Sequence, residues 1–152
     1  MKKCLTILAL TMLVGSTAYA ADQSFNATLK LKAPIIITPL TNLAFPDASI
    51  TGSAQNITVA PADAGAASFS ATGGKNRNIT RSVVESSINM NAGVVGDNIA
   101  VDTFVLSGPT AFNGSGAILA ASPIKVGATA HVLASNADGD YSGTATFRLV
   151  YQ

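Results

Sequence analysis

Few residues in this chain could carry out chemistry at neutral pH. Its 152 residues contain one histidine, His131, and one cysteine, Cys4. A serine–histidine–aspartate triad would therefore have to use His131. This residue lies in the alternating segment 124–134, on the opposite side from Ala130 and Val132, where an ordinary strand residue would also lie. We expect no catalytic site.

Two stretches have some features of ligand-binding loops. The segment TGGKN does not complete a phosphate loop, because Asn76 stands where a serine or threonine is needed. The segment NADGDYSG has oxygen-bearing side chains at alternate positions, as calcium loops do. Tyr141 and Phe147, however, occupy the places of the glycine and the last carboxylate. We expect a turn at residues 136–140, with no cofactor and no metal.

The first twenty residues have the layout of a signal peptide. Lys2 and Lys3 precede an apolar run at residues 5–14, and Ala18 and Ala20 are the small residues of a cleavage site. The apolar run is about ten residues long, whereas a membrane-spanning helix needs about twenty. We expect residues 1–20 to be removed on export, and no membrane span in the remaining chain.

Removal of residues 1–20 also removes the only cysteine, so the exported domain would fold without a disulfide. Seven basic and eight acidic residues remain, which changes the formal net charge from +1 to −1. Proteins that bind nucleic acids usually gather basic residues on one surface, so we expect no nucleic-acid partner.

The remaining sequence is rich in small, β-branched and amide residues, and it shows no long helical period. Short alternating segments between glycine and proline turns are typical of a β-sandwich. We read them as one domain, residues 34–152. The expected strands are 35–45, 56–60, 67–72, 78–85, 99–107, 116–120, 124–134 and 141–152.

Both ends of this sequence alternate between apolar and polar residues. Near the N-terminus, Pro34 interrupts the alternation. At the C-terminus the alternating strand runs to Gln152, and we expect it to lie at an edge without a further strand to cover it. The apolar positions are Phe25, Ala27, Leu29 and Leu31 in the first segment, and Tyr141, Ala145, Phe147, Leu149 and Tyr151 in the second.

Three stretches carry a family resemblance: ADQSFNATLKLKAPIIITPL, ITPLTNLAF and GDYSGTATFRLVY. In them the sequence resembles the pilins of bacterial chaperone–usher fimbriae. It is most similar to the cysteine-free subunits of the common pilus and of the enterotoxigenic colonisation fimbriae. An uncharacterised family of bacterial surface domains has the same layout. Residues 73–122 match none of these, so the resemblance covers about half of the exported chain.

The resemblance implies an all-β, immunoglobulin-like sandwich that lacks its last strand and is completed by a strand from another molecule. Residues 21–33 would be the donated extension, inserting Phe25, Ala27, Leu29 and Leu31. The strand from Tyr141 to Tyr151 would form one wall of the acceptor groove.

On this interpretation the protein is a shaft subunit of a cell-surface fimbrium, exported through the periplasm and supporting adhesion or biofilm formation. Its partners would be further copies of itself, a periplasmic chaperone, an outer-membrane usher and a tip adhesin.

Two alternatives remain open at this point. Residues 21–33 could pair within their own chain as the first strand of a complete sandwich. The protein could also be a monomeric secreted module that binds carbohydrate or protein through its loops. A neighbouring chaperone or usher gene would favour the pilin, whereas a stable monomer that folds alone would favour the module.

Overall fold

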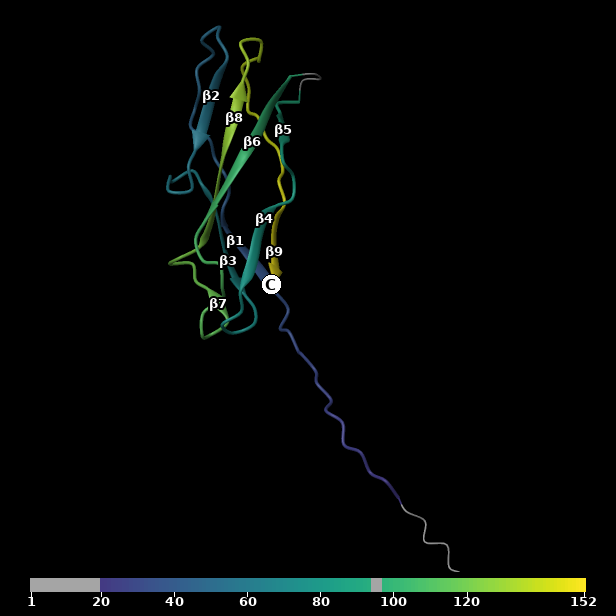
Figure 1. Ribbon diagram of the computed structural model, residues 1–152. Coiled ribbons are helices and arrows are strands. Elements are labelled where there is room, and N and C mark those ends of the chain that lie inside the picture. The colour runs from purple at the N-terminus through teal and green to yellow at the C-terminus, as the bar shows by residue number, and fades with distance from the viewer. Residues whose placement is uncertain (1–19, 94–96) are drawn as a thin grey trace, which may run out of the picture. The chain divides into compact units, whose positions relative to one another are not determined.

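The computed structural model describes residues 20–93 and 97–152, and all regular structure in these ranges is β-strand (Figure 1). The chain divides into two units at Lys30, and all the strands belong to the second. No helix in the described ranges is long and apolar enough to cross a membrane. The strands are β1 (Ile36–Thr41), β2 (Gln55–Val59), β3 (Ala67–Thr72), β4 (Ile79–Val83), β5 (Ile88–Asn91), β6 (Asn98–Ser107), β7 (Ala117–Ile118), β8 (Ile124–Val132) and β9 (Phe147–Tyr151).

The strands form two antiparallel sheets. The larger has the order β1-β3-β8-β6-β5, with β2 also paired to β8 and β7 also paired to β3. The smaller consists of β4 and β9, paired from Ile79–Tyr151 to Val83–Phe147. The predicted all-β sandwich is thereby confirmed.

Strand β8 is the centre of the larger sheet. One of its edges pairs with β6, whereas the other pairs first with β3, up to Val126, and then with β2, from Ala128. Gly127 lies at the change of partner, where a Cβ atom would overlap with the backbone carbonyl of Val59. The missing side chain therefore lets β2 approach β8 closely.

Strand β1 suits the edge of the larger sheet. Pro39, which has no N–H to donate, lies opposite Phe69 of β3, and the register shifts just after it, before Thr41. A proline is tolerated in an edge strand because only one side of that strand has to form hydrogen bonds.

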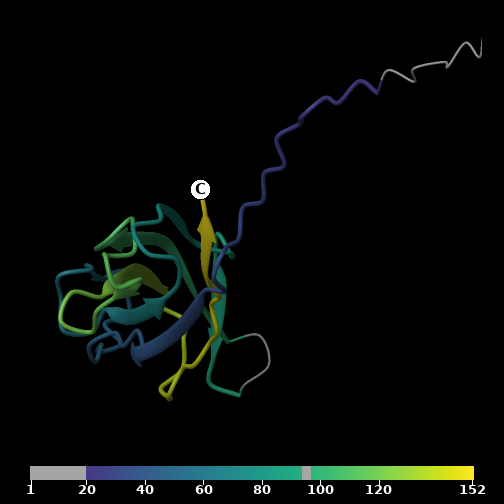
Figure 2. The same ribbon diagram turned by 90° about the horizontal axis from the view of Figure 1, so that it is seen from below.

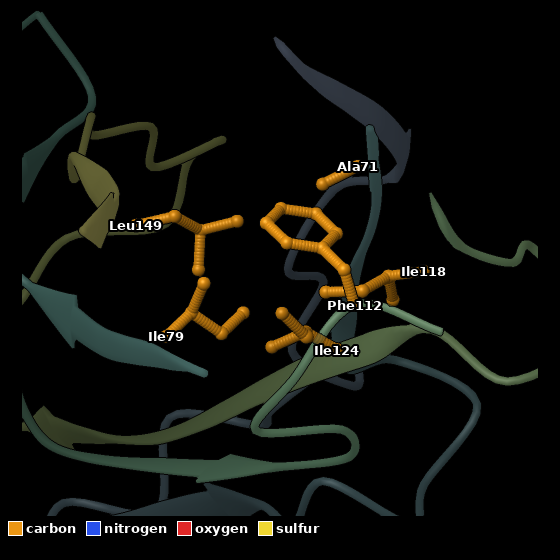
Figure 3. Close-up of a cluster of buried hydrophobic side chains, with 6 residues drawn as sticks. All are labelled: Ala71, Ile79, Phe112, Ile118, Ile124 and Leu149. Carbon is orange, nitrogen blue, oxygen red and sulfur yellow. The ribbon is translucent and has the colours of Figure 1, made fainter. Parts of the chain in front are cut away.

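The hydrophobic core consists of two clusters. The first, which we call the closed cluster, surrounds Phe112, which is only 2% exposed (Figure 3). Its buried members come from both sheets and from the loop before β7. They are Ala71, Ile79, Phe112, Ile118, Ile124 and Leu149.

The second cluster, which we call the open cluster, lies on β6 and β8. Its buried members are aliphatic and include no aromatic ring, namely Ile99, Val101, Ala128, Ala130 and Val132. The larger side chains packed against it are only partly buried. They are Leu43, Phe45, Ile57, Ile88, Met90, Phe104 and Tyr141.

Most predicted strands are present, but the C-terminal one is shorter than expected. It begins at Phe147 instead of Tyr141, because its neighbour is interrupted between β4 and β5. In this interval Ser142 forms an isolated bridge with Asn91, and the N–H of Thr146 bonds to the carboxylate of Glu85 at 2.7 Å. Strand β5 was not predicted from the sequence, and β7 is shorter than predicted.

Candidate functional site

Strands β1 and β9 are among the strands that pair with a single neighbouring strand in the described residues. Strand β1 pairs only with β3, and β9 pairs only with β4. The two strands lie near one another (Figures 1 and 2), and Ile37 of β1 packs against the closed cluster that contains Leu149 of β9. A gap between two such strands can accept an added strand.

A hollow of about 510 Å³ lies between residues 41–45, at the end of β1 and just after it, and residues 141–147, which lead up to the first residue of β9. A second hollow, of about 560 Å³, shares Leu43, Phe45, Met90 and Tyr141 with the first. Because of these shared walls, we treat the two hollows as one feature, the groove. It extends toward the loop at residues 136–140.

The groove is strongly aromatic. Four of the six phenylalanines of the chain line it, namely Phe45, Phe69, Phe104 and Phe147, and all four are only half-buried. The rings of Phe69 and Phe147 stack across the two sheets, with centroids 4.4 Å apart and planes at 17°. Partly exposed aromatic rings gathered in one hollow indicate a binding surface, since soluble monomers rarely leave large apolar patches uncovered.

In the C-terminal segment 141–152, the backbone N–H and C=O groups of every second residue face the groove. Its even-numbered residues bond to the opposite side: Ser142 exchanges hydrogen bonds with Asn91 at 2.9 and 3.1 Å, and Val84 N–H donates to Thr146 at 2.9 Å. Gln152 N–H likewise donates to Asn78 at 3.1 Å. In an extended strand the alternate residues point the other way. The N–H and C=O groups of residues 143, 145, 147 and 149 therefore line the edge that β4 and β5 leave unpaired.

We call residues 141–151 the C-terminal wall of the groove. A cluster of hydrogen bonds around Asp97 holds the start of this wall in place. The carboxylate of Asp97 accepts bonds from the Tyr141 hydroxyl and the Asn136 side-chain amide, both at 2.5 Å, and from Ala137 N–H at 2.9 Å. These hydrogen bonds lower the pKa of Asp97 below its ordinary value, and the bond from Tyr141 has the largest effect. The same bond raises the pKa of Tyr141.

Tyr151 secures the other end of the wall. Its hydroxyl accepts a bond from Gly74 N–H at 2.6 Å and donates one to the carbonyl of Ala33 at 2.7 Å. Its ring lies 5.9 Å from that of Phe112, centroid to centroid. Tyr151 therefore belongs to the closed cluster and does not line the groove.

The structure thus separates the predicted acceptor residues into two groups. Tyr141 and Ala145 line the groove, Leu149 and Tyr151 pack in the closed cluster, and Phe147 lies at the boundary and contacts both. The alternation alone could not distinguish the two groups, because all five share one face. Several other groove residues were not predicted from the sequence, since they come from loops and from the interiors of other strands. They are Leu43, Phe45, Phe69, Met90 and Phe104.

The predicted donor residues lie in a segment without regular structure. Residues 20–35 form no strand, and the side chains of Phe25, Leu29 and Leu31 are 87%, 82% and 83% exposed. Ala27, between them, is also exposed. The segment therefore leaves its alternate apolar side chains uncovered in the single chain.

His131 has a partner that the sequence did not reveal. Its Nε2 lies 2.8 Å from the carboxylate of Asp102, and its Nδ1 lies 2.8 Å from the side-chain oxygen of Asn56. Thr103 donates a further hydrogen bond to the same carboxylate at 2.8 Å, and the bond from His131 is the main cause of the lowered pKa of Asp102. Within the described ranges no group of three metal-ligating side chains is present. The arrangement is a partly exposed cross-strand pair.

Comparison with known proteins gives one match. No curated protein and no solved structure matches the chain. The model of a protein family described as "Domain of unknown function (DUF4402)" matches residues 44–151, which is more than half of the sequence and includes the strands from β2 to β9. The chain therefore belongs to the DUF4402 family.

Proposed function

We propose that this protein is a structural subunit of a surface fimbria that polymerises by donor-strand exchange and supports adhesion or biofilm formation. The observation that carries the proposal is the aromatic groove between the end of β1 and the start of β9, two strands that each pair with one neighbouring strand in the described residues. In this mechanism the extension of one subunit fills the groove of the next. Main-chain hydrogen bonds supply the pairing, and alternate side chains enter the groove.

The character of the groove supports an added strand as its occupant. The walls offer backbone groups at residues 143, 145 and 147, and the floor offers half-buried aromatic rings such as Phe69 and Phe104. An extended peptide with apolar side chains at every second position would satisfy both. A long, uncovered edge of this kind would otherwise favour aggregation.

The N-terminal segment supplies a suitable peptide. Phe25, Ala27, Leu29 and Leu31 share one face of an extended chain, and the structure places them in no strand. A contact in which each molecule gives a strand to the next does not close on itself, so it builds a filament.

Tyr141 supports an immunoglobulin-like arrangement of the sandwich. Its hydroxyl lies 2.9 Å from the carbonyl of Ala137, four residues upstream. Immunoglobulin-like domains carry such a tyrosine corner near the start of their penultimate strand. By this comparison the residues leading into β9 correspond to that strand, and the position beside it belongs to the donated one.

The proposal assigns partners and a location to the protein. A periplasmic chaperone would cover the groove before assembly, an outer-membrane usher would add each subunit, and a tip adhesin would cap the filament. The apolar floor around Phe104 and Phe147 explains the need for a chaperone, because the unfilled groove exposes surface that would bind other chains.

A second copy of residues 21–32, joined after Gln152 by a flexible linker, tests the proposal directly. We expect this chain to fill its own groove, to become a chaperone-independent monomer and to unfold at a higher temperature than the unmodified protein. The matched control carries Leu29→Asp in the added copy only and should lose the gain, because a buried charge without a partner is costly. No gain in thermal midpoint, together with an unmodified protein that is already a stable monomer, would mean that the sandwich is complete.

Deletion of residues 21–32 separates the donated strand from an intrachain strand. On the proposed function the shortened subunit still folds with its chaperone but cannot donate to a neighbour, so polymer is lost while the subunit remains soluble. An intrachain strand would give unfolding instead. Electron microscopy of producing cells with and without the protein then distinguishes a fimbrial subunit from a monomeric binding module.

A further inference from the structure

We infer that two ion pairs between neighbouring subunits, Asp22 with Arg148 and Lys30 with Asp140, set the direction and register of the donated strand. The inference rests on the proposed function, because it assumes that residues 22–32 of a second copy occupy the groove. It adds which residues determine the direction and the register of that segment.

The spacing of the charges is the same in the two segments. Lys30 follows Asp22 by eight positions in the extension, and Arg148 follows Asp140 by eight positions in the acceptor segment. The order of the charges is the same in the two segments, with the acidic residue first and the basic residue second. Only an antiparallel arrangement brings both pairs of opposite charges together, and one register does so for both at once.

The charges also lie on a suitable face. Asp22 and Lys30 occupy positions that alternate with the apolar Phe25 and Leu29, so they point away from the groove when the apolar residues point into it. Arg148 is exposed, whereas its neighbour Leu149 is buried. Asp22, Lys30 and Arg148 would therefore lie on the outer face of the completed sheet, and Asp140, which shares the alternation of Arg148, lies at the end of the groove.

The hydrogen-bond pattern of the wall brings these positions close together. Because the even-numbered residues of the segment bond toward β4 and β5, a donated strand would bond to the odd-numbered ones. Positions 140 and 148 then fall at non-hydrogen-bonded pairs, where directly opposite Cα atoms are about 4.5 Å apart and the side chains are closest. Opposite charges at such positions stabilise a sheet, and like charges destabilise it.

Other placements lose these pairs. A slip by two residues in one direction places Asp22 opposite Val150, and a slip in the other places it opposite Thr146. Parallel placements that align the charges bring Lys30 to Arg148 and Asp22 to Asp140, which are repulsive pairs.

Lys32 is not assigned to a pair. The chain bends at Asp138 and Gly139, so a regular strand does not continue to the position opposite Lys32. In the single chain the Lys32 ammonium group also lies 5.8 Å from the ring centroid of Tyr151.

The four charges are available for a partner. Asp22, Lys30, Asp140 and Arg148 are all exposed, and in residues 20–93 and 97–152 the structure shows a single ion pair, between His131 and Asp102. Arg148 makes only a minor electrostatic contribution to the lowered pKa of Glu85.

Disulfide trapping in the full-length chain tests the register. The only natural cysteine is Cys4. Cysteines are introduced in pairs, one at Asn26 or Thr28 and the other at Ser142 or Thr144, which gives four combinations of outward-facing positions. The inferred register places Thr28 opposite Ser142 and Asn26 opposite Thr144, within the Cα separation that a disulfide needs. We expect Thr28→Cys with Ser142→Cys, and Asn26→Cys with Thr144→Cys, to give covalent ladders of subunits on non-reducing gels after mild oxidation of purified polymer.

The other two combinations are the matched controls. Linkage of both Thr28–Thr144 and Asn26–Ser142 would show a parallel strand, and linkage of only one would show a slipped register. Either result overturns the inference and leaves strand exchange standing. Polymer that forms without linkage in any combination would overturn the inferred register, and the deletion of residues 21–32 then decides whether strand exchange itself stands.

Charge reversal tests the pairs themselves. We expect Lys30→Glu and Asp140→Lys each to slow polymerisation about fivefold, the size of effect that exposed ion pairs produce, and the double variant to recover it. The slowing should weaken as salt is added. A double variant that is as slow as the two single changes combined would show that Lys30 and Asp140 do not meet.

Discussion

The two halves of the core differ in how they are filled. In the closed cluster large side chains are fully buried: Phe112 is 2% exposed and Ile124 is 0% exposed. In the open cluster the buried residues are alanines, valines and one isoleucine, whereas the aromatic ring of Phe104 stays half-exposed. Both clusters lie on the same long strand, β8.

This difference shows where residues of the two sheets cover one another in the described chain. Around Phe112, residues of both sheets meet, because β4 and β9 carry Ile79 and Leu149 over the larger sheet (Figure 3). The smaller sheet starts only at Phe147 of β9. Within residues 20–93 and 97–152, no pair of strands covers Phe104 as β4 and β9 cover Phe112. The open half is the part that a donated strand would complete.

Among single substitutions in the two clusters, Phe112→Ala should have the largest effect. Truncation of a fully buried phenylalanine leaves a cavity and lowers the free energy of unfolding by about 3–5 kcal/mol. The change would also remove the ring that packs beside Tyr151. Chemical denaturation of the chain that carries the second copy of residues 21–32 measures the loss. A loss below about 1 kcal/mol would mean that the closed cluster is not the stable half.

Phe104→Ala should show the contrast between the halves. Phe104 is only half-buried, so we expect a loss of about 1–2 kcal/mol in the subunit with an unfilled groove. In the chain that fills its own groove the loss should approach the value for Phe112→Ala, because the ring is then covered. Equal losses in the two chains would indicate that no strand enters above Phe104.

Much of the fold could be predicted from the sequence because the strands alternate clearly between turn residues. The segment ASFSAT, for example, forms β3 over its predicted length. The prediction failed where pairing depends on a neighbour. Tyr141 to Thr146 alternate as well as Phe147 to Tyr151 do, but the strand beside them is interrupted between Val83 and Ile88.

The groove could be predicted only in part, for a related reason. Alternation identified the face shared by Tyr141, Phe147 and Leu149, yet it could not show that Leu149 is covered and Tyr141 is not. Phe69 and Phe104 lie far apart in the sequence, and only the sheet order β3-β8-β6 brings them to one hollow. The partner of His131 was hidden in the same way, because Asp102 is 29 residues away.

Acid should lower the stability of the open half of the core, because Asp97 becomes protonated. Its pKa is lowered in the folded protein, mainly by the bond from Tyr141, below the ordinary 3.8. The stabilisation is therefore present above about pH 4 and is lost as the pH falls through the lower, folded-state pKa. Asp97→Asn should reduce the dependence of the thermal midpoint on pH below pH 4. Part of the dependence should remain, because the pKa values of Glu85 and Asp102 are also lowered. Identical pH profiles for the two proteins would contradict this role.

His131→Ala should have the smallest effect, because it changes neither half of the core. The imidazole and the Asp102 carboxylate it contacts are 35% and 39% exposed, and exposed pairs contribute little to stability. We expect polymer yield and the groove to be unaffected, since no residue lining the groove contacts His131 through a hydrogen bond in the described structure. Asp102→Asn is the matched control, since it weakens the same pair from its other side and should behave alike. A variant that is exported and assembles normally but loses its biological role would show that His131 acts chemically, and the non-enzymatic interpretation would then have to be abandoned.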